Sequence, residues 1–145
     1  MKKIFVLMLV LGIVGGGYAG QKKHPIHLKV EALIDAAQGT EGQIQALEKG
    51  LALWENEMNR VYKEVSRAVS RSGRLQEHLV ASQKAWLKFC ETEYLYIEEA
   101  YGHQGGGILS RQMRLHDRLQ IVRARAIELG NRLLLSQDMA LGVDP

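Results

Sequence analysis

Residues 44–68 read IQALEKGLALWENEMNRVYKEVSRA, and this stretch decides the fold. Its apolar residues recur at alternating steps of three and four. This is the spacing of one face of a helix, and a strand does not produce it. The stretch therefore predicts a long amphipathic helix that packs against others along its whole length. The residues of this apolar seam are Ile44, Leu47, Leu51, Trp54, Met58, Val61, Val65 and Ala68.

Helical spacing also precedes this stretch. A short helix is expected over residues 29–38, and Gly39 fits as the residue that ends it, since glycine readily adopts the left-handed conformation of a C-cap. Thr40 and Gln43 have the spacing of a capping box, in which each side chain bonds to the backbone of the other. The long helix is therefore expected to begin at Thr40.

Two further long helices follow a break at residues 70–73. One is expected from Arg74 to Tyr101, and a glycine-rich connection separates it from the next, which frays from Asn131 onward. No segment alternates with a period of two. The predicted fold class is therefore all-α: an elongated antiparallel helical bundle of three long helices plus a short N-terminal helix. The two seams are Leu75, Leu79, Ser82, Trp86, Phe89, Tyr94, Ile97 and Tyr101, then Leu115, Leu119, Val122, Ala126, Leu129 and Leu133.

The N-terminus has the pattern of a secretory signal. Lys2 and Lys3 precede an apolar run over residues 4–14, and small residues at Gly17 and Ala19 suit a signal peptidase. The run is well short of the ~20 residues that span a bilayer, so no stable membrane insertion is expected after cleavage. We expect a signal peptide over residues 1–19 and a periplasmic or secreted protein. The domains expected after it are a tail and short helix at 20–39, a helical domain at 40–137 and a C-terminal tail at 138–145.

Composition narrows the function classes. The 145 residues fit one domain, with 46% apolar and 24% charged residues. The formal net charge of +3 includes two lysines of the signal, and the remaining charges nearly balance. Nucleic-acid binding is therefore not expected, because it needs a strong positive field. A single cysteine excludes a disulfide within the chain.

No catalytic, cofactor or metal site is predicted. His24 and His27 are separated by Pro25 and lack a third ligand nearby, and the glycines at 105–107 lack the context of a phosphate-binding loop. Cys90 lies near two glutamates, which disfavour a reactive thiolate. It is either a buried free thiol or one half of a disulfide between two chains.

Four arginines repeat every seven residues beside the seam of the last helix. One interpretation is a ladder of ion pairs within the chain, with acids of the preceding helix as partners. The other is an exposed basic edge that docks an acidic partner. The arginines are Arg111, Arg118, Arg125 and Arg132, and the acids are Glu91, Glu93, Glu98 and Glu99.

Two segments match motifs of a known family. Residues 79–89, LVASQKAWLKF, resemble the pattern Leu-x-x-Ala/Ser-Gln-x-Ala-Trp-x-x-Phe, and residues 58–62, MNRVY, resemble Leu-Asn-x-x-Tyr. Both motifs resemble those of a family of small secreted bacterial proteins, the LprI-type lysozyme inhibitors. The resemblance covers about residues 51–129. It implies a secreted helical protein and, for some members, inhibition of lysozyme. The signature positions, expected to be mostly structural, are Asn59, Tyr62, Gln83, Trp86, Phe89 and Arg125.

The family pattern also implies a disulfide between the last two long helices, which this chain lacks. Tyr94 and Asp117 stand at its cysteine positions. Aromatic packing is expected to replace the bridge, with Trp86 and Phe89 in the core against Trp54 and Met58.

The leading hypothesis is therefore a non-enzymatic, lysozyme-inhibitor-like protein whose partner is a lysozyme or another muramidase. The end of the bundle around residues 101–107 is the expected inhibitory surface. Alternatives are an envelope adaptor that acts through helix association, with a homo-oligomer possible, or an immunity-type protein against a cell-wall toxin. The candidate protein-binding residues are Glu93, Glu98, Glu99, Tyr101, His103, Gln104, Arg118 and Arg125.

Export gives the first prediction. N-terminal sequencing of the protein from an envelope fraction should begin at Gly20 or Gln21, because Ala19 completes the small-residue exit of the signal. An intact Met1 on protein from the cytoplasm would contradict it.

Overall fold

The computed structural model describes residues 23–102 and 107–140, and the predicted signal peptide lies outside these ranges. The described chain is helical and contains no strand, which confirms the all-α prediction. None of the described helices is long and apolar enough to cross a membrane. The helices are α1 (Pro25–Asp35), α2 (Gly39–Val69), α3 (Gly73–Gly102) and α4 (Ile108–Ala140).

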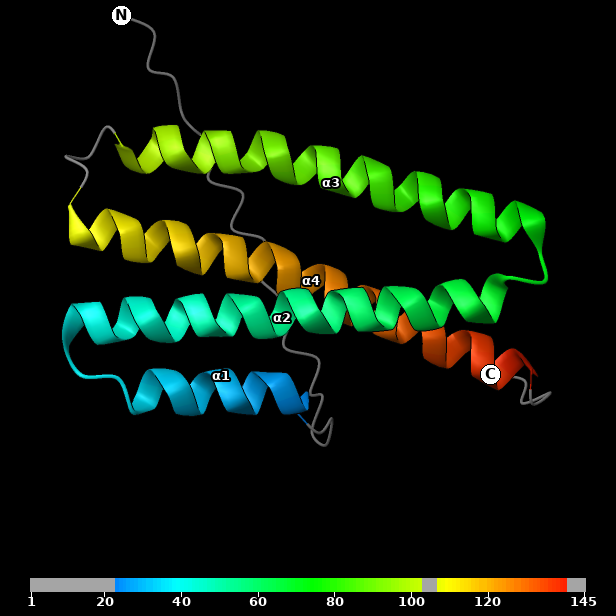
Figure 1. Ribbon diagram of the computed structural model, residues 1–145, viewed down its shortest axis with the longest axis horizontal. Coiled ribbons are helices and arrows are strands. Elements are labelled where there is room, and N and C mark those ends of the chain that lie inside the picture. The colour runs from blue at the N-terminus through cyan, green and yellow to red at the C-terminus, as the bar shows by residue number, and fades with distance from the viewer. Residues whose placement is uncertain (1–22, 103–106, 141–145) are drawn as a thin grey trace, which may run out of the picture.

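Successive helices alternate in direction, as the short connections predict (Figure 1). The closest packing, however, is between α2 and α4, which are not neighbours in the sequence. These two helices run the same way, whereas α3 runs antiparallel to both (Figure 1). Helix α1 packs on α2, and α3 contacts α4 more than it contacts α2. The bundle is thus built on a parallel pair, to which two antiparallel helices are added.

The apolar core follows from this pairing. Seams of α2 and α4 supply nine of the eleven residues in the main buried cluster, and α1 and α3 supply one each. Trp54 of α2 is fully buried, as is Leu129 of α4. The predicted seam of residues 44–68 is therefore confirmed as the central packing face, except at its last residue: Ala68 is exposed, and Val69 packs against the cluster instead. The cluster comprises Val30, Leu47, Trp54, Met58, Val61, Val65, Leu79, Leu119, Val122, Ala126 and Leu129.

Gly50 marks the point where three helices meet most closely. A Cβ at this position would lie 3.0 Å from Leu119 Cδ1 of α4 and 3.0 Å from Val30 Cγ1 of α1. Both distances are shorter than ordinary van der Waals contact. The missing side chain of Gly50 therefore allows α1 and α4 to approach α2 together.

The junction between α1 and α2 differs from its prediction. Helix α1 starts earlier, at Pro25, because a proline suits the first helical turn and His24 Nδ1 accepts a bond from the Ile26 N–H at 3.2 Å. Gly39 does adopt a left-handed φ of 66°, but as the first residue of α2. The capping box of Thr40 is absent: Gln38 is the N-cap, and the Gln43 side chain instead bonds to Gln112 of α4.

The seam of α3 is displaced from the predicted one. Phe89 is 48% exposed and Leu75 is 56% exposed, so their assignment to the core was wrong. Gln83 and Cys90 are buried, and they lie one residue beyond Ser82 and Phe89 of the predicted seam. Met58 correspondingly contacts the amide of Gln83, 3.8 Å from Nε2 to Sδ. The physical reason is Arg125 of α4, whose buried guanidinium needs the polar acceptor that Gln83 provides.

Two other predictions concern Trp86 and the length of α4. Trp86 packs against the core cluster as predicted, although it is only partly buried. Helix α4 does not fray at Asn131 but continues to Ala140. Leu129 and Leu133 at this point still pack in or against the core, so the helix is held by α2.

A pair of glycine substitutions tests the close approach at Gly50. Gly50→Leu should destabilise the protein by about 1–3 kcal/mol, because the new side chain overpacks the site. Gly130→Ala in α4 is the matched control. Its Cβ would meet nothing within 4 Å, so the better helix former should stabilise by up to about 1 kcal/mol. Urea unfolding followed by circular dichroism measures both; equal effects would contradict the packing at Gly50.

Candidate functional site

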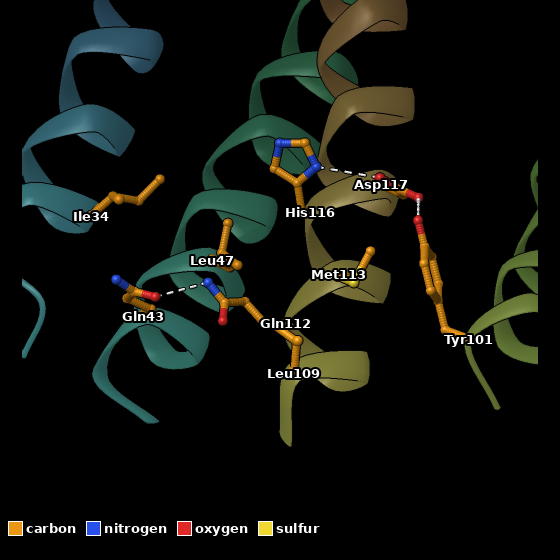
Figure 2. Close-up of a pocket in the computed structure, with 9 residues that line it drawn as sticks. All are labelled: Ile34, Gln43, Leu47, Tyr101, Leu109, Gln112, Met113, His116 and Asp117. Carbon is orange, nitrogen blue, oxygen red and sulfur yellow. Dashed lines mark hydrogen bonds and ion pairs between the residues drawn. The ribbon is translucent and has the colours of Figure 1, made fainter. Parts of the chain in front are cut away.

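A cleft of about 310 Å³ lies at the end of the bundle where α1 and α3 finish and α2 and α4 begin. All four helices contribute to its wall, and the predicted inhibitory segment adjoins it through Tyr101 (Figure 2). Its lining residues are Ile34, Gln43, Leu47, Tyr101, Leu109, Gln112, Met113, His116 and Asp117.

The apolar part of the cleft is open to solvent. Leu109, in the first turn of α4, is 62% exposed, and Ile34 and Met113 are each 37% exposed. Neighbouring exposed apolar side chains of this kind mark binding surfaces more often than single ones do. Methionine adds a flexible, polarisable side chain that adapts to different partners. The wall suits an apolar side chain from a partner.

One carboxylate stands at the polar side of the cleft. The Tyr101 hydroxyl donates to Asp117 Oδ2 at 2.7 Å, and His116 Nδ1 lies 3.3 Å from Oδ1 (Figure 2). The hydrogen bond to Asp117 raises the pKa of Tyr101, because it holds the phenolic proton. Asp117 therefore connects the end of α3 to α4 and presents a partly exposed negative charge.

Polar pairs fix the relative position of α2 and α4 beside the cleft. Gln112 Nε2 donates to Gln43 Oε1 at 2.8 Å, and Arg111 pairs with Glu48 at 2.7 Å (Figure 2 shows the glutamine pair). Both pairs lie near the beginnings of the two helices. They join the N-terminal parts of α2 and α4 beside the cleft.

The acidic patch expected near this end is partly neutralised. Glu98 pairs with Arg118 at 2.6 Å and with Arg114 at 3.3 Å, so it links α3 to α4. Glu91 pairs with Lys88 of its own helix, and Glu93 is half-buried. His103 and Gln104 lie outside the described residues. Of the predicted contact residues that the structure describes, Tyr101 is the one that lines the cleft.

The seven-residue arginine repeat forms interactions within the chain. Arg118 pairs with Glu98 of α3 as predicted, and its guanidinium lies 4.8 Å from the centre of the Tyr94 ring. Arg111 reaches α2 instead, and Arg132 pairs with Glu128 of its own helix. Arg125 is only 5% exposed. The repeat therefore acts mainly as an internal ladder, and Arg125 does not belong to an exposed edge.

Arg125 is the family-signature residue that contacts the signature residues Gln83 and Trp86 of α3. Its Nε and Nη2 donate to Gln83 Oε1 at 3.1 and 3.0 Å, Nη2 reaches Ser82, and Nη1 pairs with Glu128. The guanidinium also lies 5.9 Å from the centre of the Trp86 ring. The signature segment of α3, residues 79–89, therefore contributes to the contact with α4. Tyr62 packs against the core, whereas Asn59 and Phe89 are exposed.

Cys90 is buried, as the first of its two interpretations expects. Burial raises the pKa of its thiol, so the reactive thiolate is disfavoured. Burial also raises the pKa of neighbouring Tyr94 to about 12. A disulfide between two chains through this sulfur would require α3 to leave its place.

The two N-terminal histidines take separate partners. His24 lies 3.4 Å from Glu57 and packs its ring on Trp54 with centroids 5.0 Å apart, whereas His27 lies 3.2 Å from Glu31. They stabilise the start of α1 and its contact with α2.

Sequence reasoning missed most of the cleft. Leu109, Met113 and His116 were not singled out, although their spacing of four and three puts them on one helix face. That face is separate from the seam of α4, so its residues have the pattern of an exposed helix surface. It becomes one wall of the cleft only because α1 and α2 lie beside it in the folded protein.

Comparison with known proteins gives a family. The family described as "Lysozyme inhibitor LprI" matches residues 34–129, most of the chain. The match includes the α3 signature and all the lining residues of the cleft. No curated protein and no solved structure matches the chain.

A double-mutant cycle tests the contact between α3 and α4. Gln83→Leu alone should destabilise the protein by about 1–3 kcal/mol, because it leaves buried N–H groups of Arg125 without their acceptor. Arg125→Met alone is the second single variant of the cycle. In Gln83→Leu/Arg125→Met the charge and its acceptor are both removed, so much of that loss should be recovered. Chemical unfolding measures each variant. Additive losses would show that the two side chains are not coupled.

Proposed function

The chain belongs to the LprI lysozyme inhibitor family, and from this membership we propose that it is an exported, non-enzymatic protein that binds a lysozyme. We place the binding surface at the end cleft and the adjoining connection between α3 and α4. The observation that carries this choice is the solvent-open apolar wall with Asp117 at its polar side.

The chemistry of the cleft suits such a partner. Lysozymes are cationic enzymes that act through two carboxylates in a cleft. An apolar side chain of the enzyme would enter between Ile34, Leu109 and Met113, while a neighbouring lysine or arginine would reach Asp117. Hydrogen bonds to a charged partner group are stronger than neutral ones. The bond from Tyr101 already fixes the carboxylate, so little freedom is lost on binding.

The connection beside the cleft extends the proposed surface. Residues 103–106 join the end of α3 to the beginning of α4, and both helix ends supply lining residues. His103 and Gln104 remain predicted contacts in this segment. Glycines on both sides of them suit a loop that adapts to a partner.

Export is the second part of the proposal. The N-terminal pattern of Lys2, Lys3 and the apolar run supports a cleaved signal, and membership of an inhibitor family whose targets act on the cell wall agrees with it. A periplasmic or secreted location would bring the protein to the enzyme that it binds.

The adaptor alternative receives less support from the geometry. In that alternative, an exposed arginine edge that includes Arg118 and Arg125 would contact the partner protein. Arg125 is buried against Gln83, and Arg118 is engaged by Glu98 and the Tyr94 ring. Reversing either charge would disturb α3 before it affected a partner. An immunity-type protein against one cell-wall toxin would use the same cleft and differs only in the enzyme bound.

A lysis assay tests the proposed surface. Leu109→Glu and Met113→Glu should each weaken inhibition of lysozyme at least tenfold, because they put a charge into the apolar wall. Their melting temperatures should stay near that of the wild type, since both side chains are exposed. Leu134→Glu on α4, at a side chain 59% exposed and remote from this end, is the matched control.

The wild-type assay comes first. If purified protein leaves a panel of lysozymes fully active at high micromolar concentration, the inhibitor proposal fails. If the wild type inhibits and the cleft variants inhibit equally well, the proposed surface is wrong and the function stands.

A further inference from the structure

The polar side of the end cleft contains a histidine whose two ring nitrogens both face polar groups of its own helix. His116 Nδ1 lies 3.3 Å from Asp117 Oδ1, and His116 Nε2 lies 3.4 Å from Gln120 Nε2 (Figure 2 shows the contact with Asp117). The side chain of His116 is exposed, so it exchanges protons with solvent. Histidine is the residue type that changes charge between about pH 5 and 8.

The hydrogen bonds around Gln120 decide which nitrogen of the neutral ring carries the proton. Arg123 Nη1 donates to Gln120 Oε1 at 3.2 Å, and this contact fixes the orientation of the amide, because a guanidinium only donates. The amide then presents its N–H groups to His116 Nε2, which accepts. The ring proton therefore lies on Nδ1 and is donated to Asp117. One chain of hydrogen bonds thus runs from Arg123 through Gln120, His116 and Asp117 to the Tyr101 hydroxyl.

A second proton on the ring changes both contacts of His116. It would bind at Nε2, where it meets the N–H groups of Gln120 instead of an acceptor. The ring would also carry a full positive charge with its Nδ1 3.3 Å from Asp117 Oδ1. Opposite charges at this distance attract each other, so the imidazolium occupies the carboxylate. The protein's own cation then stands where the cation of a partner would bind.

Among the residues that the structure describes, no other lining residue of the cleft has its ordinary titration range between pH 5 and 8. The titratable side chains in the lining are Tyr101, His116 and Asp117. The hydrogen bond to Asp117 raises the pKa of Tyr101, so the phenol keeps its proton over this whole range. His116 is therefore the described group of the cleft that responds to mild acid.

The charged residues around the cleft are paired or stand outside its lining. Asp35 and Glu41, near the facing ends of α1 and α2, do not line the cleft. The ion pairs beside it are Glu48 with Arg111, and Glu98 with both Arg114 and Arg118. A positive charge on His116 thus finds Asp117 as its partner.

We propose that His116 makes partner binding at the end cleft dependent on pH. The neutral ring leaves Asp117 available to a cationic side chain of the partner, whereas the protonated ring competes with that side chain for the same carboxylate. This inference rests on the proposed function, because it takes Asp117 as the contact for a lysine or arginine of a lysozyme. Binding is therefore tighter at about pH 8 than at about pH 5.5. Because both groups are exposed, the expected change is moderate, about fivefold in Kd.

Calorimetric titration with the lysozyme that the wild type inhibits best tests the inference. The measured quantity is the ratio of Kd at about pH 5.5 to Kd at about pH 8. This ratio should be about fivefold larger for the wild type than for His116→Gln, because glutamine takes up no charge. The ratio for His116→Gln reports the titration of the enzyme itself. Circular dichroism at both pH values should show that each variant keeps its helices.

Two other histidines serve as controls. His78→Gln changes an exposed histidine near the start of α3, at the opposite end of the bundle, and should keep the wild-type ratio. His103→Gln, in the connection beside the cleft, should keep it as well. If the wild type and His116→Gln have equal ratios, or if His103→Gln removes the pH dependence instead, the inference is overturned. A wild type that binds no lysozyme at about pH 8 contradicts the proposed function, and this inference fails with it.

Gln120→Glu tests the chain of hydrogen bonds. A carboxylate at position 120 accepts from Arg123 and also from a protonated His116, so it favours the charged ring. The midpoint of the change in Kd should therefore move to higher pH in this variant, measured over a series of pH values. An unmoved midpoint would show that protonation of His116 does not control binding.

Discussion

The parallel contact between α2 and α4 is the constraint on which the other elements depend. It buries Trp54 and Leu129 completely and unites helices that are separated in the sequence by the whole of α3. Gly50 makes the contact close by removing a side chain where Leu119 and Val30 approach. Because the two helices run the same way, the chain must return along the outside. That return is α3.

Helix α3 is held mainly by polar and aromatic contacts. It supplies one residue to the main apolar cluster, Leu79, and otherwise meets α4 through Gln83 with Arg125, Tyr94 with Arg118, and Tyr101 with Asp117. Tyr94 and Asp117 stand where the family pattern implies a disulfide. Each of these two residues now takes part in a noncovalent contact between the same two helices, one through the Arg118 guanidinium and the other through the Tyr101 hydroxyl. Phe89, which the sequence predicted in that role, is half-exposed instead.

The sequence by itself determined the helices, because periodicity is a local property that each segment carries within itself. It gave the seam of α2, the break at residues 70–73, the alternation of direction and the family signature. It could not show which helices pair most closely, since α2 and α4 meet through the tertiary fold. It placed Phe89 in the core and gave Gln83 only as a signature position, because both lie near the seam of α3. The tertiary structure decided between them: Gln83 is buried and accepts two hydrogen bonds from the buried guanidinium of Arg125, whereas Phe89 is half-exposed. The cleft is tertiary for the same reason, since its walls come from four helices and no single segment contains it.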